Sequence, residues 1–207
     1  MNPQLTILAF DTSAAHCAAA LLCKGQIYHH FETMQKGQAE RLIPMLEQVL
    51  AGAGVGWRNL DALAVGTGPG NFTGVRIAVA AARGLALGLG ISAIGVTRLE
   101  ALAYDLPRPI TVIEDARRDA VYVQSFADFA ETPRLAAAGA IGQTYATVTG
   151  SAAGPMAVPA AMPLAEAILR IAAARFATPA EFPRPAPFYL RGADAAPPSD
   201  PPPVILP

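Results

Sequence analysis

This sequence has few cysteines and almost no net charge, and each of these features excludes a class of protein. Only Cys17 and Cys23 occur, six residues apart in a predicted strand, which is typical of reduced thiols rather than a disulfide framework. No other clustered ligands lie near them, so the pair is not expected to bind a metal. The 15 basic and 16 acidic residues give a net charge of −1, so no overall field attracts the chain to nucleic acid or anionic lipid. Any contact with nucleic acid is therefore expected to be shared with a partner.

A clean hydrophobic run of membrane-spanning length is also missing. The longest apolar stretch, 77–94, is broken by Arg83 and by several Gly and Ser residues, which makes it a poor membrane span. The first residues lack the basic region and the long apolar core of a signal peptide. We therefore expect a cytoplasmic protein without a membrane partner. With 207 residues, 53 % of them hydrophobic, the chain can bury a core in one domain or two small lobes.

The order of the predicted elements indicates an α/β protein. Alternating apolar runs predict strands at 5–10, 17–22, 27–34, 63–65 and 91–96. Helical spacing predicts helices at 38–52, 75–89 and 97–104. Thr97 is expected to cap the last of these helices. This order of three strands, helix, strand, helix, strand and helix is that of half of an actin-like, two-lobed protein.

A second, smaller set of elements follows in the second half of the chain. Strands are expected at 110–113, 120–126 and 146–148, and a last helix at 163–176. We divide the chain into a first lobe, 1–106, and a smaller second lobe, 107–191, with the last helix able to pack back on the first lobe. The Pro-rich tail, 192–207, has too little periodic apolar content to pack and is expected to be disordered.

The segment 66–74 is the most informative part of the sequence, because it places four glycines in nine residues just before a predicted helix. Such a loop can cradle an anion at the helix N-terminus. It lacks the Lys-Ser/Thr ending of a P-loop, and Thr73 replaces the last glycine of a dinucleotide fingerprint. A degenerate phosphate site and a tight turn that only positions the helix both stay open. The residues that would form the phosphate site are Asp11, Thr12, Ser13, Gly68, Gly70 and Thr73.

Two charged segments have both a structural and a functional interpretation. Asp11 ends the first predicted strand, where actin-like ATPases place a carboxylate toward a magnesium-bound phosphate. A strand-terminal Asp is also a common turn former, and we favour that structural role. The loop 114–119 suits mutual ion pairing, with a hinge-side or partner contact as the alternative.

Several motifs resemble those of the TsaB family. The run 68–77, which reads GPGNFTGVRI, and the GLALG at 84–88 resemble the glycine-rich motif and helix of these proteins. Further matches lie at 7–13, 41–45, 115–117 with 121–122, and 188–191. The resemblance covers residues 5–126 well and is patchy in the short, alanine-rich remainder.

The resemblance implies an actin-like ATPase-type fold, of the ASKHA and ribonuclease H-like kind. It also implies membership of the complex that attaches a threonylcarbamoyl group to the adenosine beside the anticodon of certain tRNAs. In that complex, TsaB-like subunits are not enzymes. They pair with the catalytic paralogue TsaD, the ATPase TsaE joins them, and tRNA is contacted through the complex.

Two predicted helices have apolar surfaces too wide to be covered by their own sheet alone. The helix at 75–89 is apolar around almost its whole circumference, and the helix at 38–52 has a similarly wide surface. A helix that is apolar all round must be buried all round, so we expect both helices to dock on TsaD or in a homodimer. A wholly intramolecular core is the alternative. The expected interface residues are Arg41, Leu42, Met45, Leu46, Val49, Phe72, Val75, Arg76, Val79, Ala82, Arg83 and Ala86.

Histidines at metal-binding spacing are absent from the helix at 38–52, where TsaD-like enzymes carry two of them four residues apart. His29 and His30 are neighbours in a predicted strand and point to opposite faces, while His16 is isolated. We expect no metal and no cofactor. The rival interpretation is an active actin-like enzyme that binds Mg-ATP, either a phosphotransferase or the threonylcarbamoyltransferase itself. A glycoprotease is disfavoured for want of a zinc-ligand pair or a Ser-His-Asp set.

Overall fold

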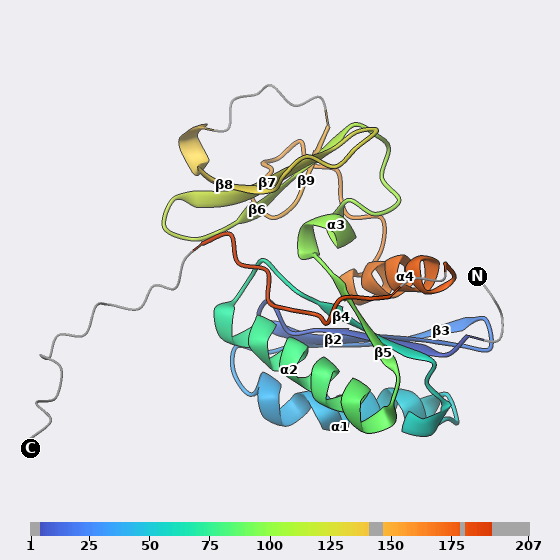
Figure 1. The fold of residues 1–207 in the computed structure, drawn as a ribbon. Coiled ribbons are helices and arrows are strands. Elements are labelled where there is room, and N and C mark those ends of the chain that lie inside the picture. Colours follow the sequence, from blue (N-terminus) through green and yellow to red (C-terminus); the bar gives the residue numbers. More distant parts are fainter. Residues whose placement is uncertain (1–4, 141–146, 179–180, 192–207) are drawn as a thin grey trace, which may run out of the picture.

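The computed structural model describes residues 5–140, 147–178 and 181–191, which form two lobes, each built on one sheet (Figure 1). The first sheet has the strand order β3-β2-β1-β4-β5. Its strands are β1 (Ile7–Asp11), β2 (His16–Cys23), β3 (Gln26–Thr33), β4 (Ala62–Gly66) and β5 (Ser92–Val96). Strands β1 to β3 form an antiparallel meander, whereas β4 and β5 run parallel to β1.

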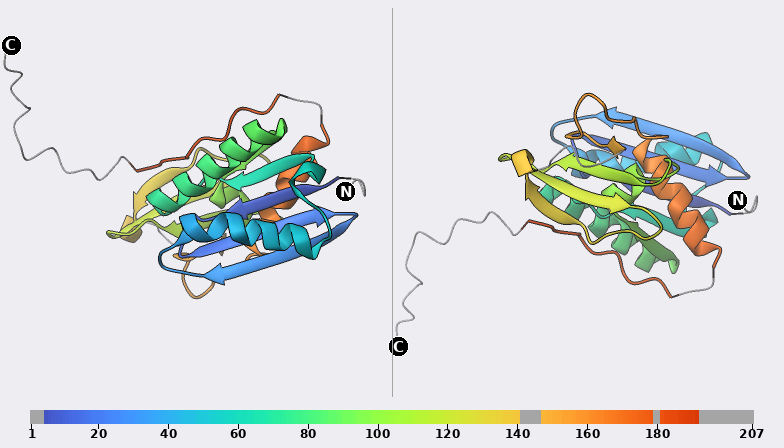
Figure 2. Two further views of the ribbon diagram at one scale, coloured as in Figure 1. Left: turned by 90° about the horizontal axis from the view of Figure 1, so that it is seen from below. Right: turned by 90° about the horizontal axis from the view of Figure 1, so that it is seen from above.

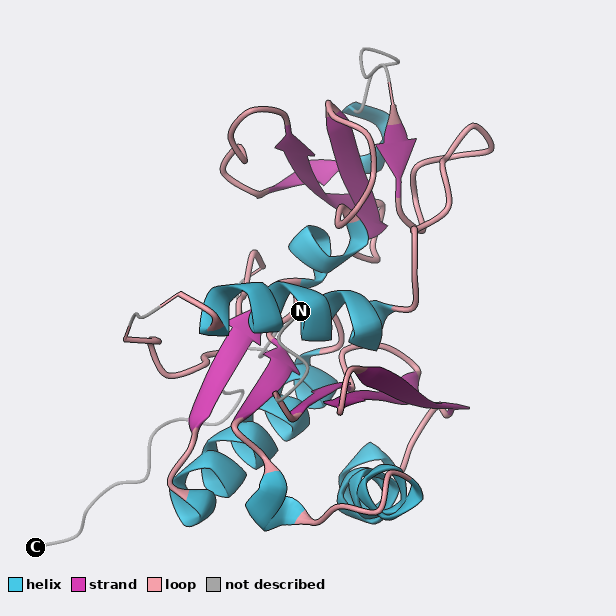
Figure 3. Cartoon of the chain, turned by 90° about the vertical axis from the view of Figure 1, so that its right-hand side faces the viewer, coloured by secondary structure: helices cyan, strands magenta, loops and turns pink. Residues whose placement is uncertain are grey.

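Helices cover both faces of the first sheet. The helices of this lobe are α1 (Gln38–Gly52), α2 (Phe72–Leu89) and α4 (Leu164–Phe176), and a 3-10 turn spans Trp57–Asn59. Helices α1 and α2 lie on one face and α4 on the other (Figure 3). The last helix in the described residues, α4, therefore packs on the first lobe.

The alternation of side chains along the central strands explains this packing. In β1, Leu8 and Phe10 point toward α1 and α2, while Ile7 and Ala9 point toward α4. The α4 side is rich in alanine on both surfaces, which lets the helix lie close to the sheet. Because both faces are covered, β2 is buried along its whole length, and after His16 its sequence is a continuous apolar run.

The second lobe is a smaller sheet with the order β8-β7-β6-β9. Its strands are β6 (Ile110–Asp115), β7 (Ala120–Phe126), β8 (Arg134–Ala137) and β9 (Val148–Thr149), and a 3-10 turn spans Ala138–Ala140. The short helix α3 (Arg98–Leu102) leads from the first lobe into the second. Strand β8 was not predicted, because its side chains are mostly exposed and lack an apolar alternation.

Most predicted elements are present with boundaries shifted by one to three residues. Helix α2 begins three residues early because Asn71 caps it, with Oδ1 accepting a hydrogen bond from Gly74 N at 3.0 Å. The Thr97 cap is confirmed, since its Oγ1 accepts from Glu100 N at 3.2 Å. Strand β9 spans Val148–Thr149, and the predicted start of this strand, like the tail 192–207, lies outside the described residues.

Helix α2 is the one helix in the described ranges that is long and apolar enough to cross a membrane. Length and composition alone are weak evidence for a membrane span, because the core helix of a soluble protein can be equally long and apolar. Here α2 packs one side on a sheet, through Gly74, Val75, Ala78, Val79 and Ala82. Both cysteines are free and buried in β2.

Candidate functional site

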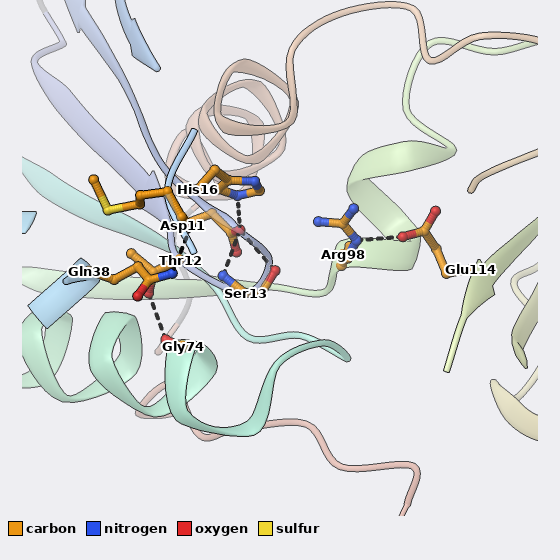
Figure 4. Close-up of polar contacts among 9 residues, drawn as sticks. Asp11, Thr12, Ser13, His16, Gln38, Gly74, Arg98 and Glu114 are labelled. Carbon is orange, nitrogen blue, oxygen red and sulfur yellow. Dashed lines mark hydrogen bonds and ion pairs between the residues drawn. The ribbon is translucent and has the colours of Figure 1, made fainter. Parts of the chain in front are cut away.

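Strands β1 and β4 end beside each other, and their carboxyl ends carry the first group of candidate residues. Asp11, the last residue of β1, is fully buried. Its Oδ1 accepts hydrogen bonds from Ser13 N at 3.0 Å and Ser13 Oγ at 2.8 Å, and lies 2.8 Å from His16 Nε2 (Figure 4). Within the described residues, Oδ2 has no hydrogen-bond partner. It packs against Gly66, where a Cβ would overlap it.

His16 is a residue whose role the sequence analysis missed. It begins β2, and its ring lies 5.4 Å from that of Phe31 on β3. The β1–β2 register pairs Asp11 with Ala18, so continuing it places position 13 opposite position 16. A predicted hairpin register was therefore the signal that could have brought His16 to the Asp11–Ser13 turn.

The charge state of Asp11 follows from competing effects. Burial raises the pKa of the carboxyl group. The hydrogen bond and charge of His16, the charge of Arg98 and the Ser13 N–H lower this pKa, and their combined effect is larger than that of burial. The net pKa lies below the ordinary value of 3.8. Asp11 is therefore a buried carboxylate that holds the β1–β2 turn, in agreement with the favoured structural role.

The glycine-rich loop packs its backbone directly on this turn. Thr12 Oγ1 donates to Gly74 O at 2.6 Å, and Asn71 N donates to Ser13 O at 2.6 Å (Figure 4). A Cβ at Gly70 would collide with Ser13 O, and one at Gly74 with Thr12 O. The loop needs glycine because the turn lies this close.

This packing bears on the expected phosphate site. The carbonyl oxygens of Thr12 and Ser13 occupy the space next to Gly70 and Gly74, and carbonyl oxygens repel an anion. Gly68 has a φ of +90° and lies against Val75 and Phe188, while Thr73 is exposed on the first turn of α2. The structure brings Asp11, Thr12 and Ser13 to the loop. Backbone atoms of Thr12 and Ser13 occupy the space that a phosphate would need, which favours the tight-turn interpretation.

A cleft with a volume of about 830 Å³ separates the two lobes. Its walls include the β1–β2 turn, the glycine-rich loop, Arg98, and residues 114–118. Arg98 Nε donates to Glu114 Oε2 at 2.7 Å, and Ser151 N donates to Glu114 Oε1 at 2.6 Å. The expected ion pairing inside the loop is thus wrong for Glu114, which instead joins the second lobe to α3. Across the described residues, no group of three His, Cys, Asp or Glu residues is placed to hold a metal ion.

The structure corrects the predicted interface at seven positions. These side chains are buried in the chain's own core against the first sheet: Leu42, Met45, Leu46, Val49, Val75, Val79 and Ala82. They cannot contact a partner while the chain is folded. In α1 the helical spacing of the buried residues does mark one face, but α2 is apolar on several sides, so spacing alone did not reveal which side of α2 faces the sheet.

The other five predicted interface residues lie at or near the surface. Phe72, Arg76 and Arg83 are exposed, Ala86 is half-buried, and Arg41 is held by Glu32 and Gln48. The residues of α1 and α2 that point away from the sheet are called the outer helix face below. They include Ile43, Phe72, Arg76, Arg83, Gly84 and Leu87. A shallow groove of about 640 Å³ lies at one end of this face, between Ile43, Trp57 and Leu89.

Comparison with known proteins decides the family. The family profile of TsaD, tRNA N6-adenosine threonylcarbamoyltransferase, matches residues 31–196. The TsaB protein of Haemophilus influenzae, named for tRNA threonylcarbamoyladenosine biosynthesis, is 42 % identical over 123 residues, which are 57 % of this chain and 52 % of that protein. The TsaB protein of Escherichia coli K12 is 38 % identical over 123 residues, 57 % of this chain and 53 % of that protein. The chain belongs to this family, on its TsaB branch.

Solved structures agree with the TsaB-type assignment. A Pseudomonas aeruginosa protein described as similar to the peptidase YeaZ has a TM-score of 0.77 at 30 % identity, covering 90 % of this chain and all of that one. YeaZ from the same organism has a TM-score of 0.72 at 32 % identity, covering 84 % and 92 %. The resemblance and the actin-like fold predicted from the sequence are confirmed. The TsaB-type chain spans about half the length of the curated relatives it matches.

Asp11 gives the TsaB-type chain a testable pH dependence. We expect Asp11→Asn to lower the free energy of unfolding at pH 7 by about 2 kcal/mol, because a hydrogen-bonded buried charge is lost. A carboxyl group whose pKa is lowered by folding stabilises the fold above its unfolded pKa and loses this effect as pH falls through its folded pKa. The difference between wild type and variant should therefore shrink below pH 3.8.

Urea unfolding at pH 7 and at decreasing pH measures this difference. Asp105→Asn, which removes the same charge from an exposed turn, is the control and should change little. A gap between Asp11→Asn and wild type that stays constant down to the lowest pH would show that the Asp11 charge does not stabilise the fold.

Proposed function

We propose that this chain is the non-catalytic scaffold subunit of a tRNA threonylcarbamoyladenosine-forming complex in the cytoplasm. In this proposal it pairs with a TsaD-type catalytic paralogue, a TsaE-type ATPase joins the pair, and tRNA is contacted through the assembly. The names of the TsaB relatives and the match to the TsaD family profile support this role.

The observation that carries the proposal is the outer helix face. Helix α2 is 18 residues long and strongly apolar, yet only five of its residues are buried. Leu87 is 84 % exposed and Phe72 is 39 % exposed. Exposed apolar surface on a rigid helix is typical of a protein docking site.

The charges of this face favour a particular kind of partner. Helix α2 carries Arg76 and Arg83 on its exposed side and no acidic residue. A partner with apolar side chains flanked by carboxylates would therefore complement it. The same face could also support a homodimer, in which α2 would meet Glu40 and Glu47 of α1 in the second copy.

Reconstitution tests the proposal. TsaD-type and TsaE-type proteins, tRNA and the adenylate-forming enzyme should produce little threonylcarbamoyladenosine until the chain is added. Product formation that is equally fast without the chain would contradict a scaffold role. Calorimetry with Mg-ATP tests the rival enzyme, since micromolar binding with turnover by the isolated chain would favour an active actin-like enzyme.

A further inference from the structure

The last described segment, residues 181–191, crosses from α4 to the opposite side of the first lobe and then reaches the second lobe (Figures 1 and 2). We call it the strap. Phe182 stacks on Phe176 of α4 with ring centroids 6.2 Å apart. Phe188 N donates to Thr67 O at 2.8 Å, next to the glycine-rich loop. The strap is thus bound at both ends of its path over the first lobe.

The strap also has contacts with the second lobe. Leu190 packs against the hydrophobic cluster of that lobe, which includes Ile110 and Tyr122. Arg191 Nη2 donates to Arg117 O at 3.2 Å. The backbone of Tyr189 therefore lies between two neighbours, Phe188 and Leu190, that are held by residues outside α2.

Tyr189 contacts the first turn of α2 at the end of the outer helix face. Its OH accepts a hydrogen bond from Arg76 Nε at 2.8 Å, and its ring lies 5.0 Å from that of Phe72. The Arg76 Cζ lies 3.6 Å from the centre of the Phe72 ring. Tyr189 is 43 % exposed, so the three side chains form one exposed aromatic–guanidinium cluster. They come from two parts of the chain 113 residues apart.

The cluster has the features of an anchor for a protein partner. Arginine and aromatic side chains are enriched among the residues that carry most of the binding energy of interfaces. Among the described residues, the side-chain hydrogen bond of Arg76 uses Nε, which leaves its terminal amino groups for a carboxylate. An arginine already held in place loses less conformational freedom on binding, an advantage of roughly two- to twelvefold in affinity.

We propose that Tyr189 is a positioning residue of the docking site, which holds Arg76 and Phe72 ready to bind a carboxylate flanked by apolar side chains on the TsaD-type partner. The inference rests on the proposed function. It assigns to the strap a part in partner binding, because the cluster is complete only when the strap is in place. The absence of any acidic residue on α2 fits this choice of partner chemistry.

The test compares Tyr189→Phe, which keeps the ring and removes the hydroxyl, with Tyr28→Phe. Tyr28 lies on β3 and is 37 % exposed, close to the exposure of Tyr189. Calorimetry with the purified TsaD-type partner should show roughly two- to twelvefold weaker binding for Tyr189→Phe, and unchanged binding for Tyr28→Phe. The melting temperature should be the same in both variants.

A double-mutant cycle separates positioning from a general structural role. In the Arg76→Ala background, Tyr189→Phe should have no further effect on affinity, because the side chain that the hydroxyl holds is gone and the ring that contacts Phe72 is kept. Equal affinity of Tyr189→Phe and wild type would overturn the inference, as would an effect that persists in the Arg76→Ala background. Failure of the wild-type chain to bind the TsaD-type protein would instead overturn the proposed function, and the inference with it.

Discussion

Replacing Leu87 with glutamate is expected to abolish pairing with the TsaD-type subunit and to leave the fold of the chain unchanged. Leu87 is 84 % exposed on the outer helix face, so the isolated chain loses almost no packing. In the complex, the glutamate would place an unpaired charge in an apolar seam, which costs several kcal/mol. We expect the dissociation constant to rise by at least about 100-fold, measured by calorimetry, with an unchanged melting temperature.

The second lobe offers a matched control for this variant. Met156 is 85 % exposed and lies between β9 and α4, away from the outer helix face. Met156→Glu should bind the partner as the wild-type chain does. Unchanged binding by Leu87→Glu would show that the outer face of α2 is not the docking site. A charge at Ala82 would not make this test, because Ala82 is fully buried and the core itself would be disrupted.

Replacing Gly74 with alanine is expected to destabilise the fold by about 1–3 kcal/mol or more, the cost of overpacking a close contact. Any Cβ at this position collides with Thr12 O, which is backbone and cannot move without displacing the β1–β2 turn. The turn also holds the hydrogen bond from Thr12 Oγ1 to Gly74 O. Urea unfolding monitored by circular dichroism measures the change.

The same helix provides the control for Gly74→Ala. Gly84 has nothing within 4 Å of the place where a Cβ would lie. Gly84→Ala should therefore raise stability by about 0.5–1 kcal/mol, the difference in helix propensity between the two residues. Equal stability of the two variants would contradict the inference that the glycine-rich loop packs too closely on the turn to admit a Cβ at Gly74.

Much of the fold was predictable from local patterns. Helix α1 has the predicted limits, and β7 spans Ala120–Phe126 as expected. These elements have strong apolar periodicity and clear turn residues at their ends. Strand β8 lacks that periodicity and was missed. The family was also recognisable, because the glycine-rich motif is long enough to be specific.

The candidate site was less predictable because its residues meet through contacts that are distant in sequence. Arg76 and Tyr189 are 113 residues apart, and Arg98 meets Glu114 across the cleft. No local pattern reports such pairs. His16 was closer to prediction, since the hairpin register places it at the turn that Asp11 closes.

The sequence by itself determined the order of the strands and helices apart from β8, the family and the need for glycine near the turn, since these follow from periodicity, backbone freedom and motif. The tertiary structure decided which side of α2 faces the sheet and which is left outside. The physical reason is that a helix with apolar residues on most sides has no strongly preferred side. Packing of Val75, Val79 and Ala82 against the strands selects one orientation, and this leaves Leu87 and Arg76 exposed.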